Sequence, residues 1–477
     1  MKRFILPLIL LLSLTLPLYA FDGFTDIFDD PVETTTTEPV TGETSTGFGI
    51  SGTVGFSFEA FSDIAKPLEA QIDIGGGLNI DLSWRGSIVD ASVNLSLNPS
   101  LQDETLEWID IFTGLSITTY FEGGRIEVGR LKKEWGSGDG VHVVDVLNAP
   151  DYRNGIVDDT LAMKVAEPML LTTALVKGTT FEIAFKPMLI PMLSEEDTTG
   201  RWFMLSKEQQ TKMATMLGAP ADPLPVDLQT PDKEDLAKLS KAQYAARVTR
   251  TMGPFDLGLI YYNGYYYEPG YDFSAYVPGN PYASPATPPS GTIKIDFTRA
   301  QLFGAEATFI TGPLTFMAEG GFWLSEDMKG TEMGKYNNKW VYLAGVGLLV
   351  PGTSTYATLT YNGHYIMDYD DSSPLAALNA DNMQAAQSSA GKRYMNTLTA
   401  AMEIPLARDT VVIRLAGTYQ IETHGYALLP SVTWNITDDL VFKANARVFG
   451  SIGGGKESIF ETWKDNDALK LGISYLF

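Results

Sequence analysis

The residue types that most often perform catalysis are scarce in this chain of 477 residues. There is no Cys, and the only imidazoles are those of His142, His364 and His424. No Gly-x-Ser-x-Gly sequence occurs, and no spacing pairs one of these His residues with a Ser, so nucleophilic catalysis is not indicated. The lack of Cys also excludes disulfides and thiolate metal sites. We therefore expect no enzymatic activity, no cofactor and no metal site.

Charge is the more informative chemistry. The chain has 58 acidic and 34 basic residues and a net charge of −24, and such a surface repels nucleic acid. On the polar faces of the predicted strands, the first half of the chain is acidic and the second half adds cations. The candidate pore-lining residues are Asp73, Asp81, Asp90, Asp110, Glu127, Arg247, Lys294, Arg414, Lys443 and Arg447. Opposed acidic and basic walls would produce a transverse field that favours small polar solutes able to orient in it.

The segments that carry these charges alternate between apolar and polar residues. The pattern is clear over residues 48–59, 71–84, 410–421 and 440–449. Alternation over ten or more residues predicts a half-buried strand that is longer than usual. A strand tilted by about 45° needs roughly 9–11 residues to cross a bilayer. Because Arg and Lys are costly in lipid but not in a water-filled lumen, we expect the polar face to point inward.

The connections between these segments alternate in length. The predicted strands are 48–59, 71–84, 87–97, 107–121, 124–131, 161–176, 180–187, 243–252, 255–265, 292–310, 314–325, 339–350, 354–367, 392–405, 410–421, 425–436, 440–449 and 467–477. Every second connection is short, such as Glu122-Gly123 or Gly253-Pro254, and the others are mostly long. This pattern predicts an all-β fold, a transmembrane antiparallel β-barrel of about 18 strands, with 16 as the alternative, short periplasmic turns and long extracellular loops.

Three further segments flank or interrupt the predicted barrel, which covers residues 47–477. Residues 1–20 join a short basic start to an apolar run and a small residue, which predicts a secretory signal peptide. Residues 21–46 form an acidic, Thr-rich linker with little to bury. The long insertion 188–242 has helical and Pro-rich parts. The sequence leaves open whether it constricts the pore, forms a lid or serves as a surface binding loop.

Two resemblances point to a protein class. Tyr475 and Phe477, at the end of an alternating final strand, resemble the C-terminal signature of outer-membrane β-barrel proteins, which the barrel-insertion machinery reads. The run from 128 to 152 resembles a G-R-x-x-x-x-W-G loop of porin-like families, although Ala149 here separates Asn148 from the following Pro. In those families the loop follows a strand and lies near the pore. The resemblance makes Arg130, Trp135, Asp139 and Asp145 pore-loop candidates.

Together these patterns predict a porin-like channel of the cell outer membrane for passive diffusion of small hydrophilic solutes. Its expected partners are outer-membrane lipid, the insertion machinery and the solutes themselves, without nucleic acid. The solute and the oligomeric state are left open. One alternative is a transporter for hydrophobic molecules of the long-chain fatty-acid type, which the Tyr-rich segment 261–267 would suit. Another is a surface adhesin or structural barrel, in which the acidic loops would matter most.

Overall fold

The computed structural model describes residues 46–63, 71–97, 111–157, 160–195, 199–208, 210–211, 227–229, 231–277, 290–369, 392–454 and 458–477. The predicted signal peptide lies outside these ranges, as do almost all of the predicted linker, Asp110 and part of the insertion 188–242. Within the described ranges, no helix is long and apolar enough to cross a membrane.

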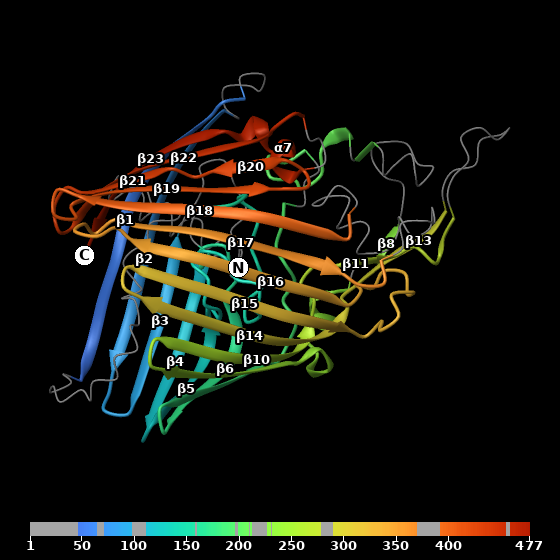
Figure 1. Cartoon of the computed structure of the whole chain (residues 1–477), viewed down its shortest axis with the longest axis horizontal. Helices are drawn as coiled ribbons and strands as arrows, with labels where there is room; N and C mark the ends of the chain where they lie inside the picture. The colour runs from blue at the N-terminus through green and yellow to red at the C-terminus, as the bar shows by residue number, and fades with distance from the viewer. Residues whose placement is uncertain are drawn as a thin grey trace, which may run out of the picture.

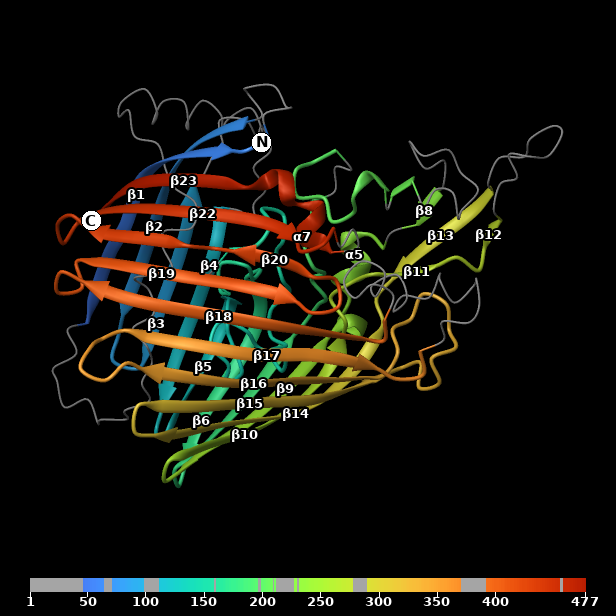
Figure 2. The same cartoon turned by 45° about the horizontal axis from the view of Figure 1, so that its top comes forward.

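The chain forms a closed antiparallel β-barrel (Figures 1 and 2). Its wall consists of β1 (Gly47–Phe61), β2 (Ile72–Arg85), β3 (Val89–Leu97), β4 (Phe112–Phe121), β5 (Gly124–Leu131), β6 (Glu167–Val176), β7 (Thr179–Lys186), β9 (Gln243–Met252), β10 (Phe255–Tyr265), β14 (Arg299–Thr311), β15 (Leu314–Ser325), β16 (Lys339–Leu349), β17 (Tyr356–Ile366), β18 (Tyr394–Leu406), β19 (Val411–Gln420), β20 (Gly425–Leu428), β21 (Ser431–Asn435), β22 (Leu440–Ser451) and β23 (Ala468–Leu476). Consecutive wall strands pair with each other, and β1 pairs with both β2 and β23, which closes the ring.

One wall position is shared by two strands. β20 and β21 follow each other between β19 and β22, so the described part of the chain forms 18 wall strands, and the predicted fold class is confirmed. The interruption falls at Leu429 and Pro430, because Pro has no N–H to give to the ladder. Pairing continues through the Pro430 carbonyl, which accepts from the amide of Ala446 at 2.9 Å.

Short turns join the strands at one end of the barrel, and long loops join them at the other (Figure 1). In the β6–β7 turn, Lys177 and Gly178 both have positive φ, 51° and 75°, which matches the twist of a tight hairpin. The seam of the barrel, where β1 pairs with β23, extends to the end of the barrel that has the short turns. There the amide and carbonyl of Phe477 bond the backbone of Gly52 at 3.0 and 2.9 Å.

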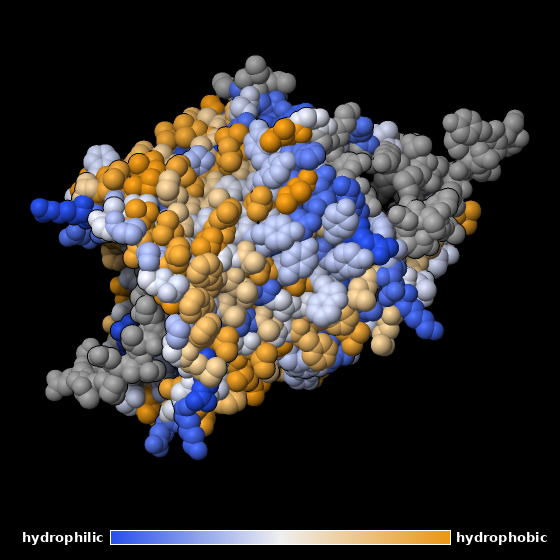
Figure 3. All heavy atoms as spheres, in the orientation of Figure 1, coloured by the Kyte–Doolittle hydropathy of each residue, from blue (hydrophilic) through white to orange (hydrophobic). Residues whose placement is uncertain are grey.

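The two faces of the wall differ as alternation requires. On β10, Leu257 and Leu259 are 38% and 67% exposed, whereas Ile260 and Tyr262 are 4% and 0% exposed. Apolar side chains cover much of the outer face seen in Figure 3. Since such a continuous apolar band is stable only against an apolar environment, the outer face is the lipid-facing surface of a transmembrane barrel.

The expected strand 292–310 is wrong in extent, because the chain forms two strands there. β13 (Ser290–Asp296) belongs to a small sheet with β8 (Asp227–Gln229), β11 (Gly270–Asp272) and β12 (Tyr276–Val277), and only β14 belongs to the wall. Between β13 and β14, side chains take over the hydrogen bonds that a continuous strand would make through its backbone. The amide of Phe297 donates to Asp296 Oδ1 at 2.8 Å, and Thr298 Oγ1 accepts from the amide of Tyr336 at 3.1 Å.

The expected strand 161–176 is also too long. Its first residues bond the preceding loop instead of the wall, as the amide of Val165 donates to the carbonyl of Ala149 at 2.9 Å, so the strand begins at Glu167. The helices of the described residues are short and lie in loops. Among them are α5 (Lys233–Leu236), η2 (Leu239–Lys241), α7 (Ile459–Thr462) and η4 (Lys464–Asn466).

Candidate functional site

The connection between β5 and β6 folds into the barrel over its described residues, 132–157 and 160–166, and we call it the inner loop (Figure 2). Three of its apolar side chains are almost completely buried: Trp135 at 2%, Val144 at 0% and Leu147 at 0% exposure. They share a cluster with inward-facing apolar side chains of the wall, namely Leu131, Met169, Leu171, Ala184, Ala245, Ile260, Tyr262, Leu302 and Val341. This part of the wall is therefore an apolar seat for the loop and not an open pore surface.

A single carboxylate fixes the tip of the inner loop. Glu319, on the inward face of β15, is 4% exposed. Its Oε1 accepts from the amides of Ser137 and Gly138, both at 2.7 Å, and its Oε2 accepts from the amides of Val143 and Val144 at 2.7 and 3.3 Å. Backbone N–H groups that converge on an anion form a strong, charge-assisted cradle. Here the wall itself supplies the anion, so the loop tip is held against β15.

His142, within the inner loop, also contacts Glu319, and we call Glu319, His142 and Glu134 together the clamp. Its Nδ1 lies 3.0 Å from Glu319 Oε1, and its Nε2 contacts Glu134. Burial opposes the protonation of His142, but the hydrogen bonds and charges of the two carboxylates outweigh burial and raise its pKa to about 10. Burial likewise opposes ionisation of Glu134, but His142 and Lys164 lower its pKa to about 2. The imidazolium is therefore charged at neutral pH and bridges the two carboxylates.

The neck of the inner loop is closed by Asn148. Its amide nitrogen donates to the carbonyls of Leu131 and Val165, both at 2.8 Å, and its Oδ1 accepts from the amide of Lys133 at 2.7 Å. The two ends of the loop are thus tied together where they leave the wall. The Asn that the sequence comparison with porin-like loops singled out has a structural role here.

The later part of the inner loop meets another part of the wall. Arg447, on the inward face of β22, donates to the carbonyl of Asn154 at 2.9 Å and forms an ion pair with Glu59 of β1. The inner loop therefore bridges the lumen from β5 and β6 to β22, and it is supported on both sides.

The insertion after β7 continues this filling of the lumen. Its early part runs along the inner loop, since Leu193 and Tyr152 bond through their backbones at 2.8 Å. Farther on, Trp202 packs edge-on against Trp463 and Phe449, with ring centroids 5.4 and 5.9 Å apart, and lies under the guanidinium of Arg447 at 4.6 Å. The described part around Trp202 thus lies inside the barrel mouth instead of forming a detached surface loop.

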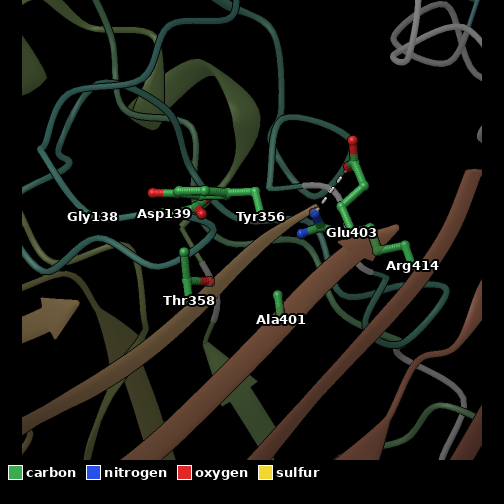
Figure 4. A pocket seen from close by; sticks show the side chains of 7 residues that line it. All are labelled: Gly138, Asp139, Tyr356, Thr358, Ala401, Glu403 and Arg414. Atoms are coloured by element: carbon green, nitrogen blue, oxygen red, sulfur yellow. Dashed lines mark ion pairs between the residues drawn. The ribbon is translucent and has the colours of Figure 1, made fainter. Parts of the chain in front are cut away.

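A cavity of about 350 Å³ remains between the loop tip and the wall (Figure 4). Gly138 and Asp139 line it from the inner loop, and the rest of the lining comes from β17, β18 and β19: Tyr356, Thr358, Ala401, Glu403 and Arg414. Arg414 Nη1 lies 3.6 Å from Glu403 Oε2. The lining of the cavity combines one cation, two carboxylates and two hydroxyls, so the cavity is suited to polar solutes. We call it the constriction.

Of the pore-loop candidates, only Asp139 lines the constriction. Trp135 is buried in the apolar seat, and Asp145 is paired with Lys164 within the loop. Arg130 has the same strand phase as the exposed Val128, on the outer face, where it donates to backbone carbonyls of the neighbouring chain segments. These three residues support the loop and its strand instead of facing the cavity.

The acidic candidates are spread along the inward faces of β2 to β5. Asp73 is the register partner of Glu59, Asp81 accepts from Asn94, and Asp90 accepts from Tyr120 Oη at 3.0 Å. Glu127 is 7% exposed and forms an ion pair with Lys133 of the inner loop at 2.8 Å. None of these four lines the constriction. Asp110 lies outside the described residues.

The basic candidates separate into different environments. Arg414 lines the constriction, whereas Arg247 is held by Glu306 and Glu182, and Arg447 by Glu59. Lys443 is 8% exposed on β22, and Lys294 lies on β13 in the small sheet, outside the wall. In the ring, the basic strands β19 to β23 adjoin the acidic strands β2 to β5 through β1, so the two sets lie on neighbouring arcs.

Sequence reasoning missed the roles of Glu319, His142 and Glu403. Glu319 stands on the inward phase of a strand, which signals a lumenal carboxylate, but its partners lie more than 170 positions away. Only the folded chain brings them together. The strand phase does indicate that Arg130 faces outward, because this residue shares its phase with Ile126 and Val128, which are 36% and 47% exposed.

Comparisons with known proteins give a distant likeness only. No family model matches the chain, and no curated protein matches it. Among solved structures, a mutant porin of Rhodopseudomonas blastica matches 90% of this chain and 100% of its own with a TM-score of 0.37 and 10% identity. OccK8 (OprE) of Pseudomonas aeruginosa matches 90% of this chain and 98% of its own with a TM-score of 0.49 and 12% identity. The architecture of this chain is therefore established by its own strand pairing.

Proposed function

We propose that this protein is a porin-like channel of the outer membrane that lets small hydrophilic solutes cross by passive diffusion. The observation that carries the proposal is the constriction, a polar cavity between a rigidly held loop and one side of the barrel wall. A wall of 18 strands is too wide to be filled by its own side chains. The inner loop reduces the width, and the charged lining of the constriction keeps the remaining space wet.

The proposed location follows from the outer face and from the sequence. The apolar band suits lipid, and only closed barrels or helices can satisfy their backbone in a membrane. A signal peptide at residues 1–20 and the aromatic end at Tyr475 and Phe477 fit export and outer-membrane assembly. Both aromatics lie on the outer face, 49% and 51% exposed, where they are available to the insertion machinery and then to lipid.

The rival functions receive less support. A path for hydrophobic molecules would need exposed apolar side chains in the lumen, but the inner loop covers them. Within the Tyr-rich segment, Tyr262, Tyr265 and Tyr266 are at most 6% exposed and pack or bond within the protein. Catalysis by His142 is disfavoured because both of its ring nitrogens face carboxylates. No contact within the described residues specifically favours an adhesin.

Reconstitution of the purified protein tests the proposal. In a planar bilayer, the barrel should produce discrete current steps, and liposomes that contain it should swell in small sugars and amino acids. Protein whose gel mobility changes on boiling is the assembled form, because a closed sheet has no edge from which to unravel. Assembled protein that gives neither current steps nor swelling would contradict a channel.

A further inference from the structure

The constriction contains an uneven number of charges. Glu403 and Arg414 face each other at 3.6 Å, so their charges largely cancel (Figure 4). Asp139 lies on the loop side of the cavity, beside Tyr356, and has no hydrogen bond or ion pair with another described residue. With one cation and two carboxylates, the lining has a net charge of −1. A solute that enters therefore meets one uncompensated carboxylate.

The ion-paired cations around the inner loop do little to offset this charge. Arg247 is neutralised by Glu306 and Glu182, and Arg447 by Glu59. Other ion pairs at the loop join Lys186 to Glu167, Lys164 to Asp145 and Glu134, and Arg153 to Asp151, while Lys133 and Arg125 share Glu127. Each of these cations has a carboxylate at ion-pair distance, which weakens its field at the constriction.

We propose that Asp139 makes the channel selective for solutes that carry a positive charge, and that its preferred substrates are small hydrophilic compounds with an ammonium or guanidinium group. This inference rests on the proposed channel function and names its substrate class. A cation passing the loop tip is attracted by Asp139, and a zwitterion can place its amine there. The hydroxyls of Tyr356 and Thr358 offer further polar contacts to the neutral part of the solute.

The size and position of the cavity agree with this substrate class. A volume of about 350 Å³ is at the lower end of the range for small-molecule sites, roughly 300–1,000 Å³. One unit charge at about 4 Å in a water-like medium changes an ion's local concentration roughly fivefold. Because salt screens this attraction over about 10 Å at 0.1 M, selectivity should be greatest at low ionic strength.

The test is the reversal potential of single channels in a dilute KCl gradient, measured for the wild type, Asp139→Asn and Asp438→Asn. Asp438 is an exposed turn residue, so its variant has the same loss of charge away from the constriction. We expect the wild type to prefer K⁺ over Cl⁻, Asp139→Asn to reduce the permeability ratio roughly fivefold, and Asp438→Asn to leave it unchanged. Liposome swelling should be faster in lysine than in glutamate for the wild type only.

The outcomes separate this inference from the proposed function. Channels that conduct but prefer Cl⁻, or whose ion preference survives Asp139→Asn in the assembled barrel, would overturn the role of Asp139 and leave the channel intact. Assembled wild-type protein without current steps would overturn both. Should Asp139→Asn fail to assemble, Glu403→Gln probes the same net charge from the wall, and an unchanged permeability ratio in that variant would also overturn the inference.

Discussion

Replacing Glu319 by Gln should release the tip of the inner loop and enlarge the constriction. The carboxylate accepts from four backbone amides and from His142. A Gln side chain keeps one acceptor and turns an N–H₂ group towards donors, so about half of these bonds are lost. Breaking a buried ion pair by removing one partner costs about 3–5 kcal/mol, and hydrogen bonds to charged groups are worth roughly 1.5–3 kcal/mol each.

The apolar seat should nevertheless keep the base of the loop in place. Burial of side chains such as Trp135, Val144 and Leu147 contributes roughly 1.5–3 kcal/mol each, and these contacts are independent of the bonds to Glu319. We therefore expect the loop tip to move while the barrel and the loop neck stay intact. In single-channel recordings, Glu319→Gln should conduct more and show more current noise than the wild type.

A matched control is available on the neighbouring strand. Glu306 is the register partner of Glu319 and is also a buried inward carboxylate, but it bonds Arg247 instead of the loop. Glu306→Gln should therefore keep the wild-type conductance, as Arg247 retains Glu182. If assembled Glu319→Gln has the conductance and noise of the wild type, the clamp does not set the width of the constriction.

Three further predictions concern pH, assembly and the inward cations. The pKa of His142 is raised from 6.5 to about 10 and that of Glu134 is lowered from 4.5 to about 2, so the clamp contributes fully to stability between about pH 4.5 and 6.5 and weakens towards pH 10 and towards pH 2. Conductance should therefore be level near neutral pH and rise at both extremes. A steep change in conductance near pH 6.5 would contradict the charged imidazole. Deletion of Phe477 removes the last backbone pair with β1 and an outward aromatic, so it should reduce the heat-modifiable form without blocking export, and equal assembly would speak against an assembly signal. Arg414→Glu should assemble and raise the cation preference, whereas Arg447→Glu places a carboxylate against Glu59 and should lower barrel yield; normal assembly of the Arg447 variant would show that this pair does not support the lumen.

The wall could be predicted from the sequence because each strand carries its own signal. β9, β10 and β15 have the bounds that alternation predicts, 243–252, 255–265 and 314–325. Lipid on one side and a filled or wet lumen on the other impose opposite preferences on successive residues, so the pattern is local. Prediction fails where the chain leaves this environment, as at Asp296 and Phe297, where a side-chain hydrogen bond ends β13 before the wall begins.

The constriction could be predicted only in part. Asp139 and Arg414 were both candidates, one from the loop motif and one from strand phase, and the fold brings them to one cavity. Nothing local shows that residues 137–144 bind a carboxylate on β15, because that contact depends on how the closed ring places β15 across the lumen from β5, six wall strands away. Strand phase likewise shows only that a cation faces inward. It does not show whether the cation lines the pore or is neutralised by a carboxylate, as Arg247 and Arg447 are.

In the proposed channel, solutes pass between the tip of the inner loop and strands β17 to β19. Because the chain contains no Cys, a single thiol can be placed on this path by Asp139→Cys and modified during a single-channel recording with a bulky methanethiosulfonate reagent. Asp438→Cys in an exposed turn is the control. We predict a stepwise loss of current for Asp139→Cys and none for the wild type or the control. Complete labelling of Asp139→Cys without any change in current would contradict this path.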